Sequence, residues 1–212
     1  MIMNFQKILA FVTYFYLTRA SPSIFEAIKK GSIPEIENIL RLNFISNQDS
    51  KNSDGNNPLH YAVSLNKTEV VNFLLENFAD PNVAQTNNGW TSLHFAVAQN
   101  NQQMTALLLD FGASPAIVDK NGNTPLCLAI DDADSNDKVG MILLLLGSWA
   151  NPNQRCEGGE LPLHKAIKSN DMYVSRLLVE NGADINLKNN DGLSAVEVAK
   201  QHHNTALANE IT

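Results

Sequence analysis

The sequence predicts an all-α fold in which helix–turn–helix units stack into a solenoid and project turns or β-hairpins along one edge. The first observation is a glycine that recurs five times, at spacings of 34, 33, 37 and 33 residues. The second is a tetrad similar to T-P-L-H that begins two residues after each glycine. A fixed period of about 33 residues is typical of proteins built from stacked repeats. The glycines are Gly55, Gly89, Gly122, Gly159 and Gly192, and the tetrads begin at Asn57, Thr91, Thr124, Leu161 and Ser194.

Each unit carries signals for two short helices. In the third unit, Thr124 is suited to cap a helix and Pro125 to occupy its first position, where a missing N–H costs nothing. A polar turn and a second apolar segment follow, as in 70–75. Gly182 then ends the second helix, because glycine readily takes the left-handed conformation. Neither helix can bury its apolar side within one unit, so neighbouring units must stack.

These motifs resemble the ankyrin repeat, which combines a period of about 33 residues with T-P-L-H-x-A. The resemblance implies a binding module for another protein, not an enzyme, and it implies no cofactor and no metal. It also divides the chain into a leading segment, 1–20, and a repeat domain, 21–212. The domain consists of an N-terminal cap at 21–53, repeats at 54–87, 88–120, 121–157 and 158–190, and a C-terminal cap at 191–212.

The leading segment has the features of a secretory signal peptide. Lys7 precedes an apolar run over 8–17, and the small residue Ala20 stands before Ser21. We therefore expect cleavage after Ala20 and a secreted or periplasmic protein. The alternative is a cytoplasmic protein in which these residues form an extra helix on the first repeat. The family resemblance adds that exported ankyrin arrays of host-associated bacteria often act as effectors on host proteins, whereas a same-cell partner would make the chain an accessory or scaffold.

The net charge of the chain limits the kinds of molecule that it is expected to bind. The net charge is −7 at pH 7 and no basic cluster is present. This balance argues against binding to nucleic acid or to an anionic membrane surface. A protein partner remains, and a capped solenoid is expected to be a monomer.

Histidine and cysteine residues occupy one equivalent position in the repeats. His60, His94 and His164 form a ladder one repeat apart and do not converge on a metal or catalytic site; the resemblance implies that they make structural hydrogen bonds. Cys127 takes this position in the third unit. It could bridge to Cys156, but two cysteines do not define a disulfide framework. Because Cys127 lies at a buried helix start, we expect free thiols.

The resemblance places the partner-binding residues on the turn tips and at the ends of the first helices. Trp90 is the strongest candidate, because an exposed tryptophan is enriched at interface hot spots; the alternative is that its ring packs against a neighbouring tip. The segment 131–137 adds four residues to its repeat and is either a solvated acidic loop or an acidic contact for a basic partner. The tip candidates are Asn56, Trp90, Asn123, Glu160 and Leu193, and the helix-end candidates are Leu65, Gln99, Asp131, Asp132 and Lys168.

Two bulky residues stand where other repeats have glycine after the second helix. Phe78 and Trp149 align with Gly112 and Gly182. Because a bulky residue is strained in the left-handed conformation, we expect a different helix end at both places. Their rings would either cover an edge of the core or form an apolar patch on the outer surface.

Overall fold

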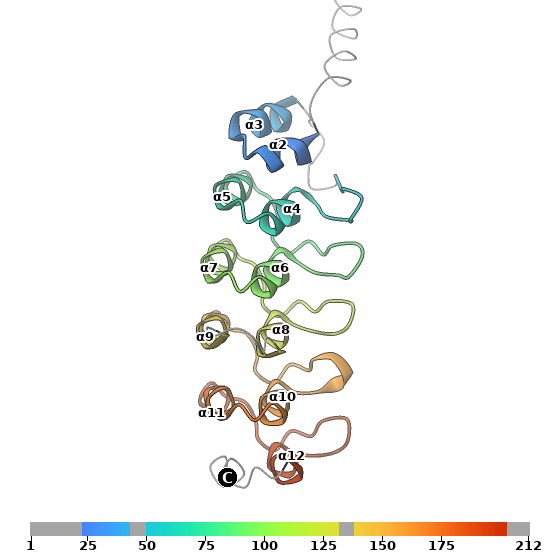
Figure 1. Cartoon of the computed structure of the whole chain (residues 1–212), viewed down its shortest axis with the longest axis vertical. Coiled ribbons are helices and arrows are strands. Elements are labelled where there is room, and N and C mark those ends of the chain that lie inside the picture. The colour runs from blue at the N-terminus through green and yellow to red at the C-terminus, as the bar shows by residue number, and fades with distance from the viewer. Residues whose placement is uncertain (1–22, 43–49, 132–137, 203–212) are drawn as a thin grey trace, which may run out of the picture.

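The computed structural model of the chain describes residues 23–42, 50–131 and 138–202. Within these ranges the fold is entirely helical, with no β-strand, and two columns of helices run side by side along its length (Figure 1). The tips beside the first column are therefore turns and not hairpins of paired strands. The inner column, next to the tips, contains α2 (Ile24–Lys30), α4 (Pro58–Ser64), α6 (Ser92–Ala98), α8 (Pro125–Asp131), α10 (Pro162–Lys168) and α12 (Ala195–Gln201). The outer column contains α3 (Ile33–Leu42), α5 (Thr68–Glu76), α7 (Gln102–Asp110), α9 (Lys138–Gly147) and α11 (Met172–Glu180), and a short 3-10 turn, η2 (Glu157–Gly159), lies in one tip.

The inner helices begin where the tetrads predict. The side chain of Asn57 accepts a hydrogen bond from the backbone N–H of His60 at 2.8 Å, and Pro58 is the first residue of α4. At the last repeat Ser194 and Glu197 form the same reciprocal cap at the start of α12. Such caps satisfy N–H groups that have no partner inside the helix. The tetrads thus fix the positions of the inner helices.

Small buried residues allow the inner helices to approach one another. An alanine recurs two positions after the ladder residue, and each copy is at most 3% exposed. Leucine and isoleucine side chains from both columns fill the space around them in one continuous core. The stacking of the units therefore depends on this alanine row. The alanines are Ala62, Ala96, Ala129, Ala166 and Ala199.

The two ends of the stack are only partly described. Helices α2 and α3 form a pair ahead of the first tetrad, where the sequence suggests an N-terminal cap. The segment 1–20 and the second half of the C-terminal cap lie outside the described residues. The domain boundaries therefore remain predictions.

The expected change of helix end at the bulky residues is wrong. Phe78 and Trp149 have φ angles of 68°, in the same left-handed region as Gly112 and Gly182. Phe78 is 88% exposed and Trp149 is 91% exposed, so neither ring covers the core. The packing of the repeat imposes the backbone conformation at this position whatever residue stands there.

Candidate functional site

Three buried histidines connect their inner helices to a backbone carbonyl further along the chain. The Nδ1 atom of His60 accepts the backbone N–H of Asn57 at 3.2 Å, so the ring is neutral and carries its proton on Nε2. That proton is donated to Val83, near the end of the same repeat, whereas His94 and His164 contact the following repeat. The three are His60, His94 and His164, and their Nε2 atoms lie 2.9, 3.1 and 3.0 Å from the carbonyl oxygens of Val83, Asn123 and Leu193.

Burial keeps these imidazoles neutral. It lowers the pKa of His60 to about 4, and it also lowers the pKa of His94 and His164. A neutral ring donates from one nitrogen and accepts at the other, as the cap and the carbonyl require at His60 and His94, whereas Nδ1 of the buried His164 has no hydrogen-bond partner. The interpretation of the histidines as a structural ladder is confirmed.

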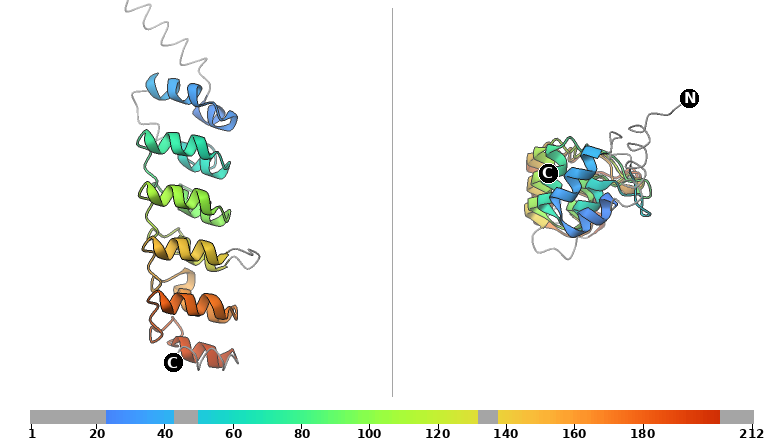
Figure 2. Two further views of the ribbon diagram at one scale, coloured as in Figure 1. Left: turned by 90° about the vertical axis from the view of Figure 1, so that its left-hand side faces the viewer. Right: turned by 90° about the horizontal axis from the view of Figure 1, so that it is seen from above.

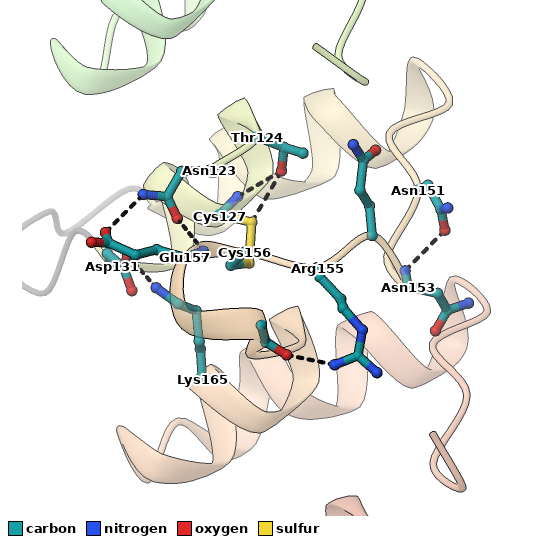
Figure 3. The surroundings of a disulfide bond; sticks show 12 residues. Asn123, Thr124, Cys127, Asp131, Asn151, Asn153, Arg155, Cys156, Glu157 and Lys165 are labelled. Atoms are coloured by element: carbon teal, nitrogen blue, oxygen red, sulfur yellow. Dashed lines mark hydrogen bonds and ion pairs between the residues drawn. A yellow bond between two sulfur atoms is a disulfide. The ribbon is translucent and has the colours of Figure 1, made fainter. Parts of the chain in front are cut away.

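The expectation of free thiols is wrong, because Cys127 and Cys156 form a disulfide (Figure 3). Their Cα atoms are 5.8 Å apart, within the range that a disulfide spans. Cys127 also retains the cap of its helix, since its backbone N–H donates to Oγ1 of Thr124 at 3.2 Å. The third repeat thus replaces the hydrogen bond of the ladder with a covalent bond.

Cys156 in turn replaces a residue that closes the tip in other repeats. Oδ1 of Asp119 accepts the backbone N–H groups of Asn121 and Asn123, and Asn52 and Asn189 do the same in their own tips. The backbone N–H of Cys156 still donates to the carbonyl of Glu160 at 2.8 Å, as that of Asp119 does to Asn123. The disulfide therefore joins the ladder position of the third repeat to the tip-closing position at the end of the same repeat.

Two predicted tip contacts are buried and cannot serve as an exposed surface. Asn56 is 6% exposed and its Oδ1 accepts from Nε2 of Gln85 at 3.0 Å. Asn123 is 5% exposed and its side chain makes two hydrogen bonds to Glu157, at 3.0 and 3.2 Å. The residue after the repeat glycine points along the stack, because the tips hydrogen-bond to one another from repeat to repeat.

Trp90 also packs within the molecule. Its ring stacks on His94 with centroids 6.4 Å apart and meets the edge of Phe95 at 5.1 Å. Its Nε1–H donates to Oδ2 of Asp119 in the next tip at 3.2 Å. These contacts favour the packing alternative over an exposed hot spot.

The last two tip candidates, Glu160 and Leu193, are partly exposed, and both interact with other residues of the protein. Oε1 of Glu160 is 2.6 Å from Nζ of Lys168 and 3.2 Å from Nδ2 of Asn189. Leu193 packs against the edge of the core, and its carbonyl accepts from His164. Both residues contribute to the stacking of the last repeats.

The helix-end candidates, in contrast, do reach solvent. Leu65 is 36% exposed, and the exposed Gln99 donates to the carbonyl of Ser64 at 3.1 Å. Asp131 and Lys168 are exposed and form ion pairs. Asp131 pairs with Lys165 of the next repeat at 2.5 Å (Figure 3), and Lys168 pairs with Glu160 of its own repeat at 2.6 Å. Asp132 lies outside the described residues. We name the described set the inner-helix face: it comprises Leu65, Gln99, Asp131 and Lys168, together with the half-buried Tyr61, Phe95 and Leu128.

The inner-helix face changes character along the stack. Its first part is apolar and aromatic, and Phe25 extends it by an edge contact with Tyr61 at 5.5 Å. Its last part carries the two ion pairs, whose charges largely cancel. The arrangement can bind a partner by surface contact, and no group of three or more metal-ligating side chains occurs in the described part of the chain. None of the described helices has the length and apolar character needed to cross a bilayer.

Comparison with known proteins agrees with this architecture. Models of ankyrin repeats match residues 59–109, 121–157 and 143–199. A protein of Arabidopsis thaliana named as a candidate E3 ubiquitin-protein ligase is 42% identical over 39% of this chain and 22% of its own length. An ankyrin repeat-containing protein of Schizosaccharomyces pombe is 33% identical over 32% of this chain and 33% of its own length.

A third relative is bacterial. A Rickettsia felis protein, also named for its ankyrin repeats, is 36% identical over 41% of this chain and 40% of its own length. The chain spans well under two thirds of each of these relatives, and the matches lie in the repeats. The periodic tetrads, the paired helices and the family matches agree, and the chain belongs to the ankyrin repeat family.

Proposed function

We propose that the chain is an exported module that binds a partner protein through the inner-helix face. The bond between Cys127 and Cys156 is the observation that carries the export. Disulfides form and persist in secreted and periplasmic proteins, whereas thiols of the cytosol are kept reduced. The features of a signal peptide in the first twenty residues support the same compartment.

The binding part of the proposal rests on side chains of the inner helices that keep part of their surface in contact with solvent. Leu65, Tyr61 and Phe95 offer apolar and aromatic contact area on successive inner helices. Aromatic side chains are enriched at protein interfaces, where burial of such area supplies much of the affinity. The ion pairs of Asp131 and Lys168 would then orient the partner at the other end of the face.

A host protein is the partner that we propose first, since export carries the chain to where such a protein could be met. The relative in Rickettsia felis supports a bacterial setting. The second candidate is an accessory role toward a protein of the same cell. The two differ in the compartment where the mature chain is found.

The test of export is the intact mass of the native protein from separated cell fractions. We expect a species that begins at Ser21, lies outside the cytoplasm and has both thiols oxidised. A full-length cytosolic species with two free thiols would overturn export and favour the accessory role.

The test of binding compares partner capture by the wild-type protein with capture by variants of the inner-helix face. We expect Leu65→Asp combined with Gln99→Lys to reduce capture tenfold or more, because both side chains reach solvent and the fold does not depend on them. Trp90→Phe is the matched control, since this ring packs within the molecule. Equal capture by the double variant and the wild type would show that the partner binds elsewhere.

A further inference from the structure

The outer helix of the third repeat lacks the polar side chains that its neighbours present to solvent. The sequence of α9 is KVGMILLLLG, and its one charged residue is Lys138. The Nζ atom of Lys138 lies 2.7 Å from Oδ2 of Asp171. The inward side of α9 is fully used, because Met141, Ile142 and Leu145 are buried. A helix that is apolar all round is normally covered on all sides, yet the outer column leaves one side of each helix open (Figure 2).

The exposed side of α9 is more apolar than the equivalent positions of the other outer helices. Leu143, which is 46% exposed, aligns with the polar Asn72 and Arg176 in α5 and α11. In α7 the equivalent residue is the small Ala106. Gly147 stands where the other outer helices carry an acid. Those acids are Glu76, Asp110 and Glu180. The third repeat has therefore exchanged a solvated helix face for an apolar one.

Trp149 extends this face beyond the end of α9 at a cost to the fold. It has a φ angle of 68° and is 91% exposed. A non-glycine residue in the left-handed region is strained, and burial of the ring does not offset that strain. Since Gly112 and Gly182 show that glycine fits the position, the tryptophan has no role in the stack that glycine could not fill.

Gly147 is likewise not required by the packing. A Cβ atom added there would meet no atom within 4 Å. Gly147 is the last residue of α9, and it removes the acidic side chain that α5, α7 and α11 carry at the equivalent place. A helix surface without a side chain permits the close approach of a second backbone.

The neighbouring outer helices add two exposed aromatic side chains. Phe111, at the end of α7, is 39% exposed, and Tyr173, at the start of α11, is 60% exposed. The three outer helices lie side by side on one surface of the molecule (Figure 2). We use the name α9 face for the exposed and half-buried residues of this part of the outer column, which are Phe111, Leu143, Leu144, Gly147, Trp149 and Tyr173.

The outer helices on either side of α9 carry two exposed acids, Asp110 of α7 and Glu180 of α11, and one base, Arg176 of α11, which is already engaged in an interaction within the protein. Asp110 and Glu180 occupy, in the two adjacent helices, the position that Gly147 occupies in α9. Among the described residues neither of them takes part in an ion pair. A second copy of the chain would bring like charges together, and an anionic lipid surface would be repelled in the same way.

We propose that the α9 face is a second binding surface, and that its occupant is an amphipathic, basic helix of a partner protein. Leucine-like side chains of that helix cover Leu143 and Trp149, and flanking Lys or Arg side chains meet Asp110 and Glu180 over Gly147. Helices with one apolar face are a common form of recognised segment. This surface lies on the outer column, away from the inner-helix face, so the proposal goes beyond the proposed function.

The test titrates the protein with a designed amphipathic helix of leucine and lysine, and with a version in which glutamate replaces lysine. The Trp90→Phe background makes Trp149 the only tryptophan, because the chain has two. We expect the lysine peptide to shift the emission of Trp149 to shorter wavelength as the ring is buried, and the glutamate peptide to leave it unchanged. The absence of a shift with the lysine peptide would overturn the proposal.

Two variants separate the apolar and the charged contributions. Trp149→Gly should weaken binding of the lysine peptide, measured by calorimetry, at least tenfold. Asp110→Lys combined with Glu180→Lys should reverse the preference toward the glutamate peptide. Leu65→Asp on the inner-helix face is the control and should bind the lysine peptide as the wild type does.

Three other results would also refute this assignment. They are unchanged peptide binding by Trp149→Gly, sedimentation as a dimer that Trp149→Gly dissociates, and Trp149-dependent binding to vesicles of anionic phospholipid. The second would make another copy the occupant, and the third would make it a lipid surface. Failure here leaves capture through Leu65 and Gln99 unaffected, so the two surfaces are tested separately.

Discussion

Removal of the disulfide between Cys127 and Cys156 should destabilise the protein by an amount that depends on the length of the loop which the bond closes. The two cysteines are 29 residues apart. Closing a loop of that length in the unfolded chain lowers its entropy, which corresponds to about 4 kcal/mol of stability at 25 °C. We therefore expect Cys127→Ser combined with Cys156→Ser to reduce the free energy of unfolding by about 4 kcal/mol.

A second variant distinguishes the covalent link from the hydrogen bonds that it replaces. Cys127→His combined with Cys156→Asn restores the residue types found at these positions in other repeats, as in His94 and Asn189. Thr124 already caps the helix by accepting the backbone N–H of residue 127, and Thr91 contacts the ring of His94 at the equivalent place. The introduced histidine should therefore be capped in the same way. We expect this pair to recover about 1–2 kcal/mol relative to the double serine variant, from one ladder bond and the closure of one tip.

The assay is urea unfolding followed by circular dichroism, with and without a reductant. The wild type should lose stability on reduction, whereas neither double variant should respond. An unchanged midpoint for the reduced wild type would refute the reasoning, and so would titration of two free thiols in the native protein.

Three further predictions concern stability. Because burial lowers the pKa of His60 from 6.5 to about 4, the unfolded chain binds more protons between these values. The contribution of His60 to stability should be complete above pH 6.5 and fall by about 3 kcal/mol toward pH 4, and His60→Gln should remove this part of the dependence in unfolding curves while the parts from His94 and His164 remain. Trp149→Gly should raise the midpoint of urea unfolding by the equivalent of about 1 kcal/mol, because it relieves a left-handed conformation without loss of core burial; a lower midpoint would contradict the strain argument. Ser194→Ala removes the reciprocal cap of α12 and should cost about 1 kcal/mol, whereas Ser194→Asp, which keeps an acceptor, should be nearly neutral in the same assay.

The sequence predicts the helices of this protein well because their signals are local. The capping residue and the proline of each tetrad act within one turn, so the starts of α4, α8 and α10 could be placed from Pro58, Pro125 and Pro162. The alanine row could also be read directly, because stacking demands small residues at a fixed place in each period. These features depend on the repeat alone and not on its neighbours.

The tips were less predictable because their side chains interact across repeats. Asn56 and Asn123 follow a turn glycine, which suggests exposure, but each contacts the next tip and is buried. Trp90 resembles an exposed anchor in the sequence, but Asp119, in the next tip, accepts its Nε1–H. A search for polar partners one period away would have detected these contacts.

The disulfide also had a signal in the sequence that was not used. Cys127 and Cys156 are 29 residues apart, and without the four residues inserted at 131–137 this equals the 25 residues from His94 to Asp119 and from His164 to Asn189. That separation brings the ladder position onto the tip of the next repeat. An alignment of the repeats on the ladder would therefore have placed the two thiols together.

The third repeat differs from the others at several positions, and the effects of these differences on stability are connected. Its ladder histidine is replaced by Cys127, its outer helix contains Gly147, and its left-handed position holds Trp149. The left-handed Trp149 lowers the intrinsic stability of the repeat, and other interactions must offset this loss. The covalent link between Cys127 and Cys156 closes a loop within the repeat that exposes the α9 face. If this reasoning holds, reduction should increase amide exchange in α9 more than in α5, and it should weaken binding of the lysine peptide while leaving the inner-helix face of the first two repeats intact.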